Sequence, residues 1–237
     1  MINQVIDYGA QPIVSESAVA KLMRNVYLWM TLALVVTGMA GYYVASSPAL
    51  FQTVFASRAT FWILAIAELG IVVYLSARID KMAFSTAAIM FVVYSVLNGV
   101  LLSSIFVVYT MESLASVFFI TAGTFGAMAL VGSFIKTDLS AMGRILVMTL
   151  FGLIIATIVN MFIGSSGLTL VLNYVGVLVF VGLTAYDAQK IKMMLYQYGT
   201  DVNEGTMKIA LLGSLSLYLD FINLFLYLLR IFGSSRD

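Results

Sequence analysis

A stretch of 42 consecutive residues, Ile145–Tyr186, contains no charged side chain. A helix needs about 20 apolar residues to cross the hydrocarbon core of a bilayer, so this stretch predicts two spans joined by a turn. Backbone groups in lipid must hydrogen-bond within one helix or around a closed barrel. Because the stretch lacks the polar and apolar alternation of barrel strands, it predicts helices.

The same apolar character extends over the whole chain of 237 residues, of which 62% are hydrophobic and 10% charged. A soluble domain carries about 25% charged residues. We therefore predict an all-α membrane protein, a seven-transmembrane-helix bundle, with a cytoplasmic N-terminal tail at 1–25, a transmembrane domain at 26–231 and a short C-terminal tail at 232–237. The expected spans are Val26–Ala45, Thr60–Ala77, Met82–Thr110, Leu114–Ile135, Ile145–Ile163, Leu168–Tyr186 and Lys208–Ile231.

Several classes of function are disfavoured by composition. The net charge of +1 offers no basic face for nucleic acid. The chain has no cysteine and no histidine, which excludes disulfides, thiol nucleophiles and zinc sites of the usual ligand types. We expect no tightly bound cofactor, and the lipid bilayer is the partner that the composition demands.

The lysines and arginines predict an orientation. In a seven-span chain, one side holds Lys21, Arg24, Arg78, Lys81, Lys136, Arg144, Lys190, Lys192 and Lys208, and the other holds Arg58, Arg230 and Arg236. Cytoplasmic loops carry the excess of positive charge. We therefore predict a cytoplasmic N-terminus, an outside C-terminus and, with such brief termini, a bacterial inner (plasma) membrane.

Three carboxylates fall inside the expected spans or at the end of one: Glu68, Asp187 and Asp220. A charge at the centre of a span costs about 2.5–3.5 kcal/mol on insertion scales, so such residues usually face the bundle interior and have a function. Asp220 belongs to a stripe on one face of the last span, spaced three and four residues apart. The stripe consists of Gly213, Ser216, Asp220, Asn223 and Tyr227. A seam that only joins helices is the alternative, although it would not require a carboxylate.

The other two carboxylates leave more alternatives open. Asp187, at the inner end of the sixth span, could be an interfacial acid paired with Lys190 or Lys192, and Glu68 could be bonded to a neighbouring helix. If Asp187 and Asp220 meet in a dry site, both cannot be ionised without repulsion, so they would share a proton and titrate as a unit. At higher pH the pair would repel itself or attract a hard cation, and oxygen ligands suit Ca²⁺. They can meet only if the sixth helix continues past Lys190 or shifts inward.

A longer pattern is visible in two segments, Gly182–Ile191 (GLTAYDAQKI) and Leu217–Phe225 (LYLDFINLF), the second of which is followed by Leu228-Leu229-Arg230. These segments resemble the signature of the Bax inhibitor-1 family of small membrane proteins. The resemblance extends across the whole chain, including the acidic second span around Glu68, and the short N-terminal tail is similar to bacterial members.

The resemblance implies a seven-helix bundle whose last helix is surrounded by the other six. It also implies a pH-sensitive Ca²⁺ leak controlled by two aspartates, which match Asp187 and Asp220. A basic residue at the inner end of the second span acts as a latch in the family, and Arg78 is the nearest match.

We therefore expect a leak for Ca²⁺ that is gated by H⁺. Protonated Asp187 and Asp220 would hold the sixth and seventh spans together. Deprotonation would free a path along which Glu68, Asn98 and Asn223 lie, with Ca²⁺ bound transiently at the two aspartates.

Two other classes of function are also compatible with acidic residues inside a membrane. An intramembrane aspartyl protease would also pair aspartates, but Leu217–Leu219 stand where Gly-x-Gly is expected, and no proline follows Pro48 to form a Pro-Ala-Leu element. We therefore expect no enzymatic activity. A non-conducting regulator that binds membrane proteases or other membrane-protein partners stays open as the alternative.

Overall fold

The computed structural model describes residues 16–198 and 201–236. Within them, seven helices are long and apolar enough to cross a membrane, which confirms the predicted number of spans and the all-α fold class. The elements in chain order are α1 (Glu16–Ser46), α2 (Pro48–Phe55), α3 (Arg58–Arg78), the 3₁₀ turn η1 (Ile79–Lys81), α4 (Phe84–Val108), α5 (Met111–Phe134), α6 (Ser140–Ile163), α7 (Ser166–Tyr198) and α8 (Glu204–Phe232).

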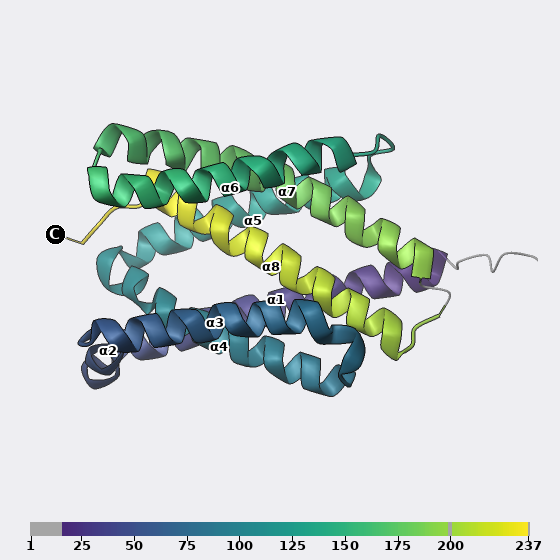
Figure 1. Cartoon of the computed structure of the whole chain (residues 1–237), viewed down its shortest axis with the longest axis horizontal. Helices are drawn as coiled ribbons and strands as arrows, with labels where there is room; N and C mark the ends of the chain where they lie inside the picture. The colour runs from purple at the N-terminus through teal and green to yellow at the C-terminus, as the bar shows by residue number, and fades with distance from the viewer. Residues whose placement is uncertain (1–15, 199–200, 237) are drawn as a thin grey trace, which may run out of the picture.

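The last helix, α8, forms the centre of the bundle. It crosses obliquely between a layer that contains α5, α6 and α7 and a layer that contains α1, α3 and α4 (Figure 1). In the most apolar stretch of each helix, 67% of the α8 residues are buried, against 11% for α3 and for α6. α8 packs directly on α1, α4, α5 and α7, whereas α3 packs on α4 and α6 packs on α7. The central position expected for the C-terminal helix is thus confirmed.

Local sequence sets where several helices begin and end. Asn203 caps α8 by accepting a hydrogen bond from the Thr206 backbone N–H at 3.0 Å, and the Thr206 hydroxyl accepts one from the Asn203 N–H at 2.9 Å. Gly164 ends α6 with a φ of 68°, a left-handed conformation that glycine adopts without steric cost. Between α1 and α3, where no span is expected, the chain forms the short helix α2 from Pro48, because proline fits the first turn of a helix.

Two helices extend ten or more residues beyond the expected spans. α1 begins at Glu16, well before Val26, so part of the expected N-terminal tail is helical, and residues 1–15 of that tail lie outside the described residues. α7 continues to Tyr198, beyond the expected end at Tyr186. The C-terminal tail pairs with the α4–α5 turn, where the Arg236 N–H donates to the Val108 carbonyl oxygen at 2.8 Å.

The bundle has two distinct ends. We call the end at which α1 begins the N-terminal end, and the end that carries α2 and the C-terminus the C-terminal end (Figure 1). Because the seven spans alternate in direction, the nine lysines and arginines assigned to one side of the membrane gather at the N-terminal end. Which leaflet this end faces stays a prediction.

Candidate functional site

Asp220 lies in the middle of α8 and is almost completely buried, with 5% of its surface exposed. Among the described residues, its Oδ2 atom has no hydrogen-bond partner. A buried polar atom without a partner raises the free energy of the folded state, because it loses its hydrogen bonds to water and forms none in the protein. Asp220 is therefore a candidate functional residue.

Asp187 lies in the same layer of the bundle as Asp220. On one side of the pair, Gly213 of α8 lies so close to α7 that a Cβ atom there would be 2.9 Å from Cγ2 of Ile191. On the other side, the rings of Phe180 and Tyr227 stack with centroids 5.8 Å apart. Each aspartate lies between these two contacts on its own helix, and the carboxylates are close enough to interact electrostatically.

The length of α7 makes this arrangement possible. The predicted sixth span ended at Tyr186, which would have left Asp187 at the membrane surface, away from Asp220. The helix instead runs to Tyr198 and carries Lys190 further toward the N-terminal end. The condition stated for the two aspartates to meet, continuation of the helix past Lys190, is met.

The α5–α6 connection holds α7 beside the pair through a residue that the sequence did not single out. Gln189 is buried, and its Oε1 accepts a hydrogen bond from the Leu139 N–H at 2.8 Å while its Nε2 donates to the Thr137 carbonyl oxygen at 2.8 Å. Its place in the segment Gly182–Ile191, two residues after Asp187, was the signal available in the sequence. Gln189 therefore fixes the position of α7, along its axis, relative to the α5–α6 connection.

A second polar group surrounds Glu68. The Asn98 amide of α4 donates to the Glu68 carboxylate of α3, and the Tyr94 hydroxyl also bonds to Glu68. The Oδ1 atom of Asn98 is buried and has no hydrogen-bond partner within the described part of the chain. Glu68 and Asn98 are thus brought together, as a bond between Glu68 and a neighbouring helix would require.

The Glu68 group connects to α8 on the side away from Asp187. The rings of Tyr94 and Tyr218 meet edge to face at 5.8 Å. Tyr218 and Asp220 are two positions apart on a helix with 3.6 residues per turn, so their side chains leave α8 on nearly opposite sides. α8 therefore separates two polar groups, one that contains Asp187 and one that contains Glu68.

Tyr218 also binds α1 through a buried chain of hydroxyl groups. The Thr37 hydroxyl donates to the Ser95 carbonyl oxygen at 2.9 Å and lies 2.7 Å from the Tyr218 hydroxyl. Because the single Thr37 proton is already used, Tyr218 is the donor in the second bond. These bonds join α1, α4 and α8.

We expect Tyr218→Phe to lower the free energy of unfolding by about 1 kcal/mol, because it leaves the buried Thr37 oxygen without its donor. Thermal unfolding in detergent measures the effect. Tyr43→Phe is the matched control, since Tyr43 is 68% exposed. Equal midpoints for the two variants would contradict an energetic contribution from this bond.

The remaining predicted site residues are not joined to the aspartates. Asn223, one turn beyond Asp220, donates to the Leu219 carbonyl oxygen at 2.8 Å and lines a cavity of about 210 Å³ together with Arg230. Arg78 is exposed at the end of α3, and among the described residues no hydrogen bond or ion pair links it to either aspartate. Its latch role stays a prediction.

Comparisons with known proteins agree with the architecture. A family model described as inhibitor of apoptosis-promoting Bax1 matches residues 19–237. The inner membrane protein YbhL of Escherichia coli is 48% identical over 214 residues, which cover 90% of this chain and 92% of that protein. An uncharacterised protein of Borreliella burgdorferi is 41% identical over 92% of this chain and 93% of its own. One of Rickettsia prowazekii is 41% identical over 94% and 93%, respectively. The chain therefore belongs to the Bax inhibitor-1 family of membrane proteins.

Proposed function

We propose that this protein is a pH-sensitive Ca²⁺ leak pathway whose gate is the proton-sharing pair of Asp187 and Asp220. One observation carries the proposal: two carboxylates from neighbouring helices lie in one layer of a membrane-embedded bundle, and Asp220 is buried with an unbonded oxygen. Intramembrane carboxylates usually mark ion or proton pathways, because insertion of a charge into lipid is unfavourable.

The two protonation states of the pair have different mechanical effects. With one shared proton, the carboxyl groups form a hydrogen bond that holds α7 against α8. When the proton leaves, two negative charges repel each other in a site of low polarity, the helices separate, and the oxygens attract a cation. We therefore expect Ca²⁺ flux to rise with pH.

The oxygen ligands available at the pair suit a Ca²⁺ ion that passes through better than a Ca²⁺ ion that stays bound. Ca²⁺ prefers six to eight oxygen ligands, and no cluster of three or more acidic, cysteine or histidine side chains suited to a metal occurs within the described residues. Two carboxylates hold Ca²⁺ only weakly, as conduction requires. Asn223, one turn beyond Asp220 on α8, offers a further oxygen along the proposed path, whereas Glu68 and Asn98 lie on the opposite side of α8.

The proposed setting is a bacterial inner membrane with the N-terminal end of the bundle in the cytoplasm. The excess of lysine and arginine at that end supports this orientation. The name of the similar Escherichia coli protein, an inner membrane protein, supports the location. The leak would then connect the cytoplasm with the outside.

Flux measurements in liposomes test the proposal. Purified protein is reconstituted around a Ca²⁺ dye, and influx is followed from about pH 5 to about pH 8, the interval in which a buried carboxylate pair can titrate. We expect influx that depends on pH in the wild type and no such dependence in Asp187→Asn or Asp220→Asn. Glu68→Gln is the comparison variant, and it should keep the pH dependence.

Other outcomes would change the assignment. An effect confined to Glu68→Gln would move the ion site to α3 and make the aspartates structural. Flux that falls as pH rises, and still depends on both aspartates, would assign the closed state to the ionised pair and point to a cation such as Arg78 as its latch. Folded protein that gives no flux above empty liposomes would contradict a leak and favour a non-conducting regulator.

A further inference from the structure

A lateral groove runs between α1 and α5, in a part of the bundle that the proposed leak does not use. Both helices pack on α8, but they leave a gap between them. Three adjoining cavities occupy the gap, with volumes of about 440, 390 and 230 Å³ from the N-terminal end inward. The first and second share Tyr27 and Leu130, and the second and third share Leu34, Phe118 and Phe221, so the three form one continuous groove.

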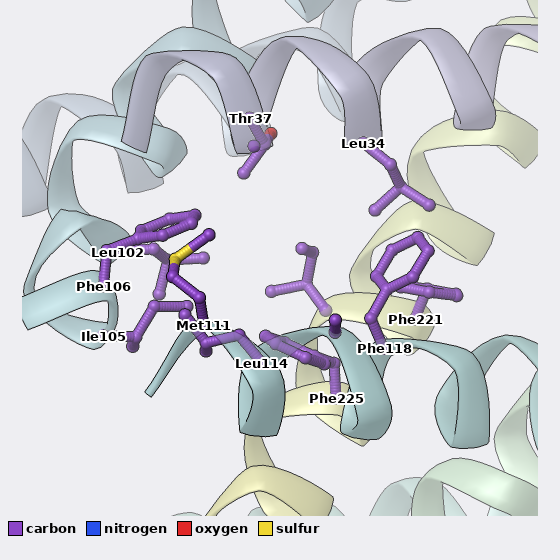
Figure 2. Close-up of a pocket in the computed structure, with 13 residues that line it drawn as sticks. Leu34, Thr37, Leu102, Ile105, Phe106, Met111, Leu114, Phe118, Phe221 and Phe225 are labelled. Carbon is purple, nitrogen blue, oxygen red and sulfur yellow. The ribbon is translucent and has the colours of Figure 1, made fainter. Parts of the chain in front are cut away.

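The inner part of the groove is almost entirely apolar. Figure 2 shows its far end, where Leu34 of α1 faces Leu114 and Phe118 of α5. Phe221 and Phe225 of α8 line the same cavity. This composition suits a hydrocarbon chain and gives no anchor for a polar ligand.

The end of the groove that lies at the N-terminal end of the bundle is cationic. Its cavity is lined by Arg24, Lys192 and a single carboxylate, Glu16. The Lys192 ammonium donates to the Ser133 carbonyl oxygen at 2.7 Å and lies near the rings of Phe134 and Tyr196. This contact positions Lys192 but uses one of its three N–H donors. Arg24 is exposed and has no hydrogen bond or ion pair to any other residue that the structure describes.

The groove also has the length of a lipid tail. Its apolar part extends along α1 from Tyr27 to Gly38, which is about 16 Å at 1.5 Å per residue. One leaflet of the hydrocarbon core is about 15 Å thick, half of the bilayer value. A chain that starts at the level of Arg24 and Lys192 would therefore end where the groove ends.

We propose that this groove binds one anionic glycerophospholipid, with its phosphate at Arg24 and Lys192 and one acyl chain along the apolar floor. Charge complementarity at the head and the match in length along the tail both favour this occupant over an apolar helix of another protein. The bound chain would cover the face of α8 that carries Phe221, next in sequence to Asp220.

Native mass spectrometry of the delipidated protein tests the head of the site. Phosphatidylglycerol and phosphatidylethanolamine with identical chains are titrated separately. We expect the first phosphatidylglycerol to bind about tenfold more tightly than phosphatidylethanolamine, and the double variant Arg24→Gln/Lys192→Gln to lose this preference. Lys21→Gln is the matched control, because Lys21 is an exposed cation on α1 that does not line the groove. Equal affinity for the two lipids, or equal loss in the control, would overturn the proposal.

A second pair of variants tests the tail. Gly126 lines the groove and Gly123 does not, and a Cβ atom on either glycine meets nothing within 4 Å. Gly126→Leu should displace the first bound phosphatidylglycerol, whereas Gly123→Leu should keep it. Unchanged binding in Gly126→Leu would overturn the proposal. A dimer that persists when phosphatidylglycerol is added would also overturn it, because a second copy of the chain would then occupy the groove. If Gly126→Leu does not fold, the double variant of the head still decides.

Discussion

Replacement of Gly132 by leucine is expected to lower the free energy of unfolding by about 3 kcal/mol or more and to abolish recovery of folded protein. Gly132 of α5 lies directly against the backbone of α7, where any Cβ atom would overlap the carbonyl oxygen of Ala185. A flexible side chain can move away from such an overlap, but a helix backbone cannot do so without displacing the whole of α7. Thermal unfolding and size-exclusion chromatography in detergent measure the loss.

The control for this prediction is on the same helix. Gly123→Leu makes an identical chemical change at an exposed position of α5 where a Cβ atom meets open space. It should therefore keep the wild-type unfolding midpoint within experimental error. A Gly132→Leu protein as stable as the Gly123→Leu protein would mean that α5 and α7 are not in backbone contact.

The second large effect is expected from removal of both aspartates together. If Asp187 and Asp220 share one proton, each single asparagine variant already destroys the titrating unit, so the double variant should lose no more pH-dependent flux than either single variant. Release of one shared proton also limits the slope of the wild-type curve to about tenfold per pH unit. The measurement is dye influx into liposomes as a function of pH for the four proteins.

Independent sites would behave differently. Effects of the two single variants would then add in the double variant, because sites without a shared partner contribute separately. Asp187→Glu and Asp220→Glu serve as conservative controls that keep a carboxyl group at each position. Additive losses, or a wild-type slope well above the limit for one proton, would contradict a single proton shared by the pair.

Hydropathy alone predicted the number of spans and most of their limits. The second expected span, Thr60–Ala77, lies within α3, and the fifth, Ile145–Ile163, lies within α6. Such agreement is expected, because in lipid each helix must satisfy its own backbone hydrogen bonds and needs a minimum apolar length.

The same reasoning misplaced the end of α7, because it measures where apolar residues stop and not where a helix stops. Residues from Asp187 to Tyr198 are more polar than lipid tolerates, but contacts with other helices and loops support them. Gln189 bonds to the backbone before α6, and Lys192 bonds to the end of α5. These contacts are tertiary, and no local pattern in the sequence of α7 predicts them.

The stripe on the last span was informative but incomplete. It identified the face of α8 that meets α7, as the contact of Gly213 with Ile191 and of Tyr227 with Phe180 confirms. The opposite face of α8, about which the stripe gives no information, carries Tyr218, whose hydroxyl group joins a buried polar chain with Thr37. Periodicity cannot reveal this function of a tyrosine, since an aromatic ring counts as apolar in the pattern.

The apolar pattern of the chain is enough to predict a seven-span helical bundle and to identify the carboxylates that lie in or beside the spans. These properties follow from the cost of polar groups in lipid, and this cost acts on each segment separately. The central position of the last helix was expected only from the resemblance to the family. The packing of the helices places Asp187 and Asp220 in one layer, puts Glu68 in a different group and leaves a groove between α1 and α5, and the sequence predicts none of these. Those properties depend on the relative height and spacing of helices, which are set by contacts such as that of Gly132 with Ala185, between residues distant in the chain.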